Sequence, residues 1–182
     1  MPVLFASYSG LLGGAERLLL DAAAGLEEPP TLACPEGPLA ERAGAAGLHV
    51  LTLRERPLEL RDRRAGATLD LLGMRRELDA IVRAVRPELL YAWGMRALLA
   101  AVGLRRRPPL AFQHNDLLPG PAVARAVRAA ARRAEAVSTA SECIARELGI
   151  PGAQTIHPGV DLDRFVPVPP PDGPPELLVL GA

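Results

Sequence analysis

The stretch VLFASYSGLLGGAERLLLD, from Val3 to Asp21, has the order that decides the fold: a short apolar run, a Gly-Gly pair and a helical apolar pattern. This order predicts a buried strand, a glycine turn and a helix. A helix N-terminus offers free backbone N–H groups and a positive dipole end to anions, and glycine lets them approach closely. The turn at Gly13 and Gly14 is therefore interpreted either as an anion site or as a tight turn that binds nothing. Its spacing alone favours neither.

Short apolar runs alternate with helical patterns along the rest of the chain. We expect strands near 3–8, 31–34, 49–53, 88–92, 109–113, 136–139 and 153–156, and helices near 14–26, 38–47, 67–85, 94–104, 121–134 and 141–148. Such alternation is typical of α/β proteins. The sequence therefore predicts a Rossmann-like parallel sheet of about seven strands with helices on both faces.

The composition narrows the classes of protein. With 182 residues, 49% of them hydrophobic, and no apolar run long enough to cross a bilayer, the chain is expected to form a globular domain in the cytoplasm. All 21 basic residues are arginine, which excludes a P-loop lysine, a pyridoxal Schiff base and a lysine general base. The zero net charge gives no reason to expect nucleic acid as a partner. Cys34 and Cys143 stand far apart outside any paired motif, so we expect free buried thiols, no metal site and no disulfide.

The C-terminal end has a different composition. The segment PVPPPDGPP, Pro167 to Pro175, has six prolines in nine residues, a content that neither a helix nor a central strand accepts. The residues after it, ELLVLGA, have the pattern of a new buried strand. We therefore expect a Rossmann-like domain over 1–165, a proline-rich linker over 166–175 and the first strand of a further domain over 176–182.

Four predicted turns follow strands and carry residues suited to binding. They are Gly10–Gly14, Tyr91–Met95, Gln113–Asp116 and Thr139–Glu142. In doubly wound sheets ligands bind beyond the carboxyl ends of the strands, so these turns are expected to meet at one edge. The glycine turn lacks the GxGxxG spacing, and the second predicted strand ends without an acidic residue, which disfavours a nicotinamide enzyme.

His114 is the candidate catalytic residue. It follows an apolar run and is flanked by Gln113, Asn115 and Asp116, more polar side chains than a turn needs. Histidine can act as an acid, a base or a charged phosphate partner. Alternatively, it bonds a neighbouring carbonyl while Asn115 and Asp116 form the turn. Trp93 also has two interpretations: stacking on a sugar or base at the edge, or filling the core.

Arginine gathers in two further segments. Residues 54–64 carry five arginines and three acids, and the helix expected over 121–134 places Arg125, Arg128 and Arg132 on one face. A solvated surface explains both segments, and contact with an anionic lipid surface or a phosphorylated acceptor is the alternative. Ser141 is expected to cap the helix that follows it.

Taken together and in order, several segments resemble the N-terminal domain of the GT-B glycosyltransferases of family 4. These segments are SYSGLLGGAERLLLDAAAGL, RPELLYAWG, AFQHNDLLPG, AVSTASECIARELGI and TIHPGVDLDRFVPVPP. The most specific part, Ile156–Phe165, is similar to the family pattern IPNGVDxxRF, with His157-Pro158 where Pro-Asn is commoner.

The resemblance implies a retaining hexosyltransferase that moves a sugar from a nucleotide-sugar donor to a polysaccharide or lipid-linked acceptor, with no cofactor or bound metal. It places Gly13 and Gly14 at the donor diphosphate and His114 at the reaction centre. The implied acceptor contacts are Trp93, Asn115, Asp116, Arg61, Arg63 and Arg64. The family's nucleotide pocket and its E-x7-E glutamates belong to a C-terminal domain, so this fragment is expected to be inactive alone. A peripheral contact with the inner face of a membrane would use the arginine segments. The alternative function is a non-catalytic Rossmann-like binding domain.

Overall fold

The computed structural model describes every residue except 57–63, 161, 164 and 167–182, and of residues 64 and 65 only the backbone. Seven parallel strands form one sheet in the order β3-β2-β1-β4-β5-β6-β7. The strands are β1 (Val3–Ser7), β2 (Thr31–Pro35), β3 (His49–Leu53), β4 (Leu89–Trp93), β5 (Leu110–His114), β6 (Ala136–Thr139) and β7 (Gln154–Thr155). The helices are α1 (Gly14–Ala24), α2 (Pro38–Ala45), α3 (Arg64–Val85), α4 (Met95–Ala101), α5 (Pro121–Ala131) and α6 (Glu142–Leu148). The predicted Rossmann-like sheet is confirmed.

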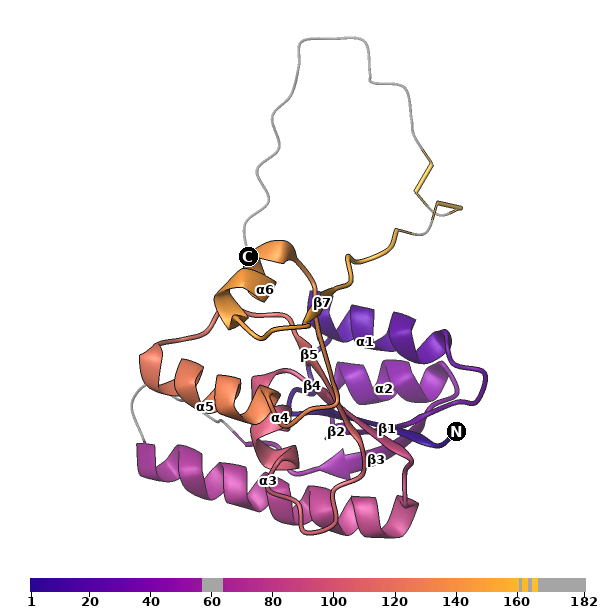
Figure 1. Cartoon of the computed structure of the whole chain (residues 1–182). Helices are drawn as coiled ribbons and strands as arrows, with labels where there is room; N and C mark the ends of the chain where they lie inside the picture. Colours follow the sequence, from indigo (N-terminus) through magenta and orange to yellow (C-terminus); the bar gives the residue numbers. More distant parts are fainter. Residues whose placement is uncertain (57–63, 161, 164, 167–182) are drawn as a thin grey trace, which may run out of the picture.

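Helices cover both faces of this sheet (Figure 1). Strands β2 and β3 are added on one side of β1, and strands β4 to β7 are added on the other side. Right-handed crossovers therefore place α1 and α2 on one face and α3 to α6 on the other. Side chains alternate along β1: Val3 and Phe5 pack with α1 and α2, whereas Leu4 and Ala6 pack with the core of the other face.

The carboxyl ends of β1, β4, β5 and β6 lie at one edge of the sheet. Ser7 pairs with Trp93, and His114 pairs with Thr139. The strand order reverses between β1 and β4, which is where ligands bind in this class of sheet. The expectation that the four polar turns converge is therefore confirmed.

Two glycines let the loops after β1 and β2 touch. Gly37 has φ +143°, and a Cβ added to it would lie 2.7 Å from the carbonyl oxygen of Gly10. A Cβ on Gly10 would lie 2.5 Å from the carbonyl oxygen of Glu36. The close backbone approach thus demands glycine at Gly10, whereas a Cβ on Gly14 would meet nothing within 4 Å.

Some predicted boundaries differ from those observed. Helix α3 begins at Arg64 rather than at residue 67, so Arg64 belongs to the helix and not to a loop. Helices α1, α4 and α5 end two or three residues sooner than predicted, and Gly25 caps the first of them. The predicted linker lies outside the described residues except for Val166, which is exposed, and the predicted strand over 176–182 lies wholly outside them.

Candidate functional site

The glycine turn leads into α1 at the edge where the strands end. Gly13 is the N-cap of α1, and its N–H donates to the Glu16 carboxylate at 3.0 Å. Glu16 was not predicted from the sequence; an acid three residues after the N-cap is one half of the capping-box signal, and Gly13 lacks the side chain that would supply the other half. Among the described residues, the next N–H groups, on Gly14 and Ala15, have no acceptor. The turn therefore keeps free donors for an anion, with a carboxylate already at the first of them.

His114 lies at the end of β5 and is completely buried. Neither Nδ1 nor Nε2 has a hydrogen-bond partner, so the alternative in which the ring bonds a neighbouring carbonyl is wrong. Burial lowers the pKa of His114, and the nearby Asp116 and Glu147 carboxylates raise it to a smaller extent. The imidazole is therefore neutral, with one nitrogen free to donate and the other free to accept a hydrogen bond.

The opposite face of the same strand end carries a polar network. The Ser138 hydroxyl donates to Gln113 Oε1 at 2.5 Å and lies 3.0 Å from the Tyr91 hydroxyl. Gln113 Nε2 donates to Asn115 Oδ1 at 2.9 Å. Tyr91 opens one of the four predicted turns, but its bond to Ser138 was not predicted, and Ser138 itself was missed, because β4 and β6 are far from Gln113 in the chain. Asn115 is thus engaged within the protein, whereas Asp116 is exposed.

Trp93 is a core residue, so its expected role in stacking on an acceptor is wrong. Its side chain is 4% exposed, and its ring packs near those of Phe5 and Tyr91. The indole Nε1 donates to the Ala15 carbonyl at 2.9 Å. Trp93 therefore ties β4 to the first turn of α1 and positions the glycine turn.

The structure describes only part of the arginine segment 54–64 that was expected to contact the acceptor. Arg61 and Arg63 lie outside the described residues, and of Arg64 the backbone alone is described. Arg56 forms a two-point ion pair with Glu77 on α3, which lowers the pKa of that carboxyl. This pair fixes the chain beside α3 just before residue 57.

Arg128 does not belong to a solvated face of α5. Its Nε and Nη2 donate to the carbonyls of Leu148 and Glu147 at 3.0 and 2.7 Å, so it caps the C-terminal end of α6. The predicted cap at the other end of α6 is confirmed: Ser141 Oγ accepts from the N–H of Ile144 at 3.3 Å. These contacts hold the helix that follows β6.

The two cysteines differ in burial. Cys34 is buried in β2, and desolvation raises the pKa of its thiol to about 11. Cys143 is exposed, so the prediction that both thiols are buried is wrong for this residue. The part of the chain that the structure describes holds no cluster of three or more His, Cys, Asp or Glu side chains suited to a metal.

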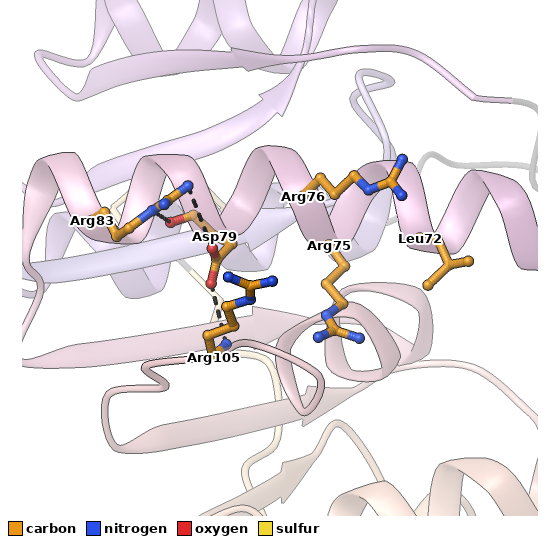
Figure 2. Close-up of a pocket in the computed structure, with 6 residues that line it drawn as sticks. All are labelled: Leu72, Arg75, Arg76, Asp79, Arg83 and Arg105. Carbon is orange, nitrogen blue, oxygen red and sulfur yellow. Dashed lines mark hydrogen bonds and ion pairs between the residues drawn. The ribbon is translucent and has the colours of Figure 1, made fainter.

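A hollow of about 380 Å³ lies between α3 and the segment that carries Arg105 (Figure 2). Asp79 pairs with Arg83 at 3.5 Å and accepts from the N–H of Arg105 at 3.2 Å, whereas Arg75 and Arg76 have no such partner among the described residues. Arg105 precedes β5, so this hollow lies toward the end of the sheet where β5 begins. It is separate from the edge that carries His114. No helix in the described ranges is long and apolar enough to span a bilayer.

The reversal of strand order, with polar groups beyond β1, β4 and β5, defines the class of protein: a Rossmann-like domain of the kind found in GT-B glycosyltransferases. The chain belongs to Glycosyltransferase Family 4, whose family model matches residues 12–164. A comparison with curated protein sequences gives no match.

Solved structures share this fold. HepE from Anabaena, crystallised with UDP and glucose, superposes with a TM-score of 0.73 and 19% identity over 90% of this chain and 46% of its own. A glycosyltransferase from Rickettsia africae superposes with a TM-score of 0.65 and 13% identity, over 91% of this chain and 45% of its own. Sucrose-phosphate synthase from Thermosynechococcus elongatus superposes with a TM-score of 0.64 and 14% identity, over 92% of this chain and 50% of its own. The chain therefore spans about half the length of these solved structures, and at such identities the likeness shows the fold alone.

Proposed function

We propose that the chain is the acceptor-binding N-terminal half of a retaining hexosyltransferase of the cytoplasm, which moves a sugar from a nucleotide-sugar donor to a polysaccharide or lipid-linked acceptor. The observation that carries the proposal is His114, a completely buried imidazole with two unpartnered nitrogens at the binding edge. Membership of the family supports transferase chemistry. The complex of HepE with UDP-glucose supports a nucleotide-sugar as the donor, which is a co-substrate rather than a resident cofactor.

The geometry suits a reaction in which a nucleoside diphosphate departs. Negative charge builds on phosphate oxygens, and the free N–H groups of Gly14 and Ala15 at the start of α1 offer fixed donors to it. A diphosphate at this turn would replace the Glu16 carboxylate on the N–H of Gly13. His114, neutral through burial, would donate to or accept from a sugar hydroxyl beside the reacting carbon.

The test is release of nucleoside diphosphate from a panel of UDP-, GDP- and dTDP-sugars. We expect release by the chain extended through its natural reading frame, and none by the 182-residue chain alone. In the extended chain, His114→Ala should lower the rate at least about 100-fold. The control His49→Ala alters an exposed histidine of β3 and should keep the wild-type rate.

Two outcomes would contradict this function. Wild-type release by a folded His114→Ala variant would remove His114 from the mechanism. No release by the extended chain from any donor, with every variant folded by circular dichroism, would support the non-catalytic binding domain instead.

We also propose that the hollow on α3, lined by Arg75, Arg76 and Arg105, makes a peripheral membrane contact, rather than the arginine segments 54–64 and 121–134 that the sequence suggested. The guanidinium groups of Arg75, Arg76 and Arg105 have no carboxylate partner among the described residues, and such groups bind anionic lipid headgroups. The chain should co-sediment with phosphatidylglycerol vesicles at low salt and stay free of phosphatidylcholine vesicles. Arg75→Glu with Arg76→Glu should abolish binding, and Arg125→Glu with Arg132→Glu on α5 should not. Equal binding by the α3 variant, or none by wild type, would show that the hollow is ordinary solvated surface.

A further inference from the structure

Tyr8 and Arg96 make a contact at the point where the strand order reverses. Tyr8 directly follows β1, and Arg96 is the second residue of α4, which follows β4. The guanidinium carbon of Arg96 lies 4.2 Å from the centre of the Tyr8 ring. Nε of Arg96 is buried and has no hydrogen-bond partner. The guanidinium therefore lies over an aromatic ring at the binding edge, and one of its N–H donors is shielded from water.

Nothing in the described part of the chain neutralises this arginine. None of the four ion pairs between described residues includes Arg96. A buried N–H without an acceptor costs free energy. The face of the Tyr8 ring attracts the cation but supplies no hydrogen-bond acceptor. An oxyanion would supply both the missing acceptor and the missing negative charge.

A second arginine lies beside Tyr8 and favours a doubly charged anion. Arg54 lines the same small hollow as Tyr8 and is exposed, whereas its neighbour Arg56 is neutralised by Glu77. Arg54 and Arg96 thus each border Tyr8, and their two positive charges attract a doubly charged phosphate more strongly than a singly charged carboxylate. The planar fork of arginine can bond two phosphate oxygens at once.

This site is distinct from the glycine turn. Tyr8 packs against the core of α3, α4 and α5, whereas Trp93, which bonds the first turn of α1, packs in the core of α1 and α2. The two sites thus lie on opposite faces of the sheet edge. An anion at Arg96 is therefore a different group from a diphosphate at Gly13 and Gly14.

We propose that Arg96, oriented by Tyr8, binds a phosphate group of the acceptor. The identification of that ligand as the acceptor rests on the proposed function, whereas phosphate binding at Arg96 does not depend on sugar transfer. The site would select a phosphorylated acceptor over a neutral glycan.

The test is titration of the 182-residue chain with inorganic phosphate, followed by nitrogen–proton correlation spectra of the arginine side chains. Because Nε of Arg96 is buried, its N–H signal should exchange slowly with water, and its loss in Arg96→Met would identify it. We expect phosphate to shift this signal and Arg96→Met to weaken phosphate binding at least tenfold. Arg132→Met, an exposed arginine at the end of α5, is the matched control and should bind as wild type. Tyr8→Leu should weaken binding less than Arg96→Met does.

Titrations with acetate and with UDP separate the possible ligands. We expect acetate to bind at least tenfold more weakly than phosphate. We expect UDP, whose pocket the family places in the other domain, to leave the Arg96 Nε–H signal unchanged. Unchanged phosphate affinity in a folded Arg96→Met variant would overturn the proposal, and so would acetate binding as tight as phosphate. A shift of the Arg96 signal by UDP as large as the shift by phosphate would assign Arg96 to the donor and would also overturn the proposal. None of these outcomes depends on whether the extended chain transfers sugar.

Discussion

Replacing His114 by leucine should make the free energy of unfolding less sensitive to acid. His114 is completely buried, its two ring nitrogens have no partner, and burial lowers its pKa from an ordinary value of 6.5. Below pH 6.5 the unfolded chain binds a proton at this residue that the folded chain does not bind. The free energy of unfolding of the wild type must therefore fall as the pH falls through this range.

The size of the effect follows from the same linkage. If the buried imidazole stayed neutral throughout, the loss between pH 7 and pH 5 would reach its ceiling of about 2 kcal/mol. Carboxylates titrate mainly below this window. In His114→Leu this loss is absent, and an apolar side chain of similar size also removes two unsatisfied polar atoms. We expect the variant to be at least as stable as wild type at pH 8. The difference in their free energies of unfolding should then grow as the pH falls to 5.

The assay is urea unfolding followed by circular dichroism at half-unit steps of pH. His49→Gln removes an exposed histidine of β3 and is expected to follow the wild-type curve. Parallel curves for wild type and His114→Leu would refute the reasoning, because they would mean that His114 takes up its proton equally in both states. The ring would then have a partner or a path to water that the structure does not show.

Three other predictions concern contacts that position or surround the site. Trp93→Phe loses the bond to the first turn of α1 and leaves part of the buried indole volume empty, so it should lower the free energy of unfolding by about 2 kcal/mol in urea. Arg128→Met removes two bonds to the last carbonyls of α6 and should cost about 2 kcal/mol in the same assay, whereas Arg125→Met should cost nothing measurable. A thiol reagent should label Cys143 in the native chain and Cys34 only after unfolding, because burial raises the pKa of Cys34 to about 11; rapid labelling of both would contradict the buried position of β2.

The sequence predicts the sheet and the location of the binding edge well. Buried parallel strands need continuous apolar runs, and the run from Val3 to Ser7 is buried at every position. Once the strands are known, parallel pairing alone brings the turn after His114 to the same edge as the glycine turn. The histidine at the end of a strand could therefore be identified without the structure.

Details that depend on which helix lies over a residue could not be predicted. Trp93 is in the core because α1 offers a carbonyl to its indole, and Arg128 is a cap because α6 ends beside α5. Both partners are distant in sequence, so local patterns carry no signal for them. The unsatisfied state of His114 and the contact of Arg96 with Tyr8 are of the same kind, since they are set by neighbours from other strands.

Unsatisfied polar atoms are concentrated at one place in the fold. In the described residues, the buried side-chain nitrogens and oxygens without partners belong to Arg96, His114 and Glu147. Arg96 follows β4, His114 ends β5, and the other oxygen of Glu147 accepts from the loop after β5 through the N–H of Leu118. A core built for stability alone would pair such groups or replace them, as the neighbouring network of Tyr91 does. The fold therefore gives up stability at the carboxyl ends of β4 and β5, where a bound ligand can supply the missing partners.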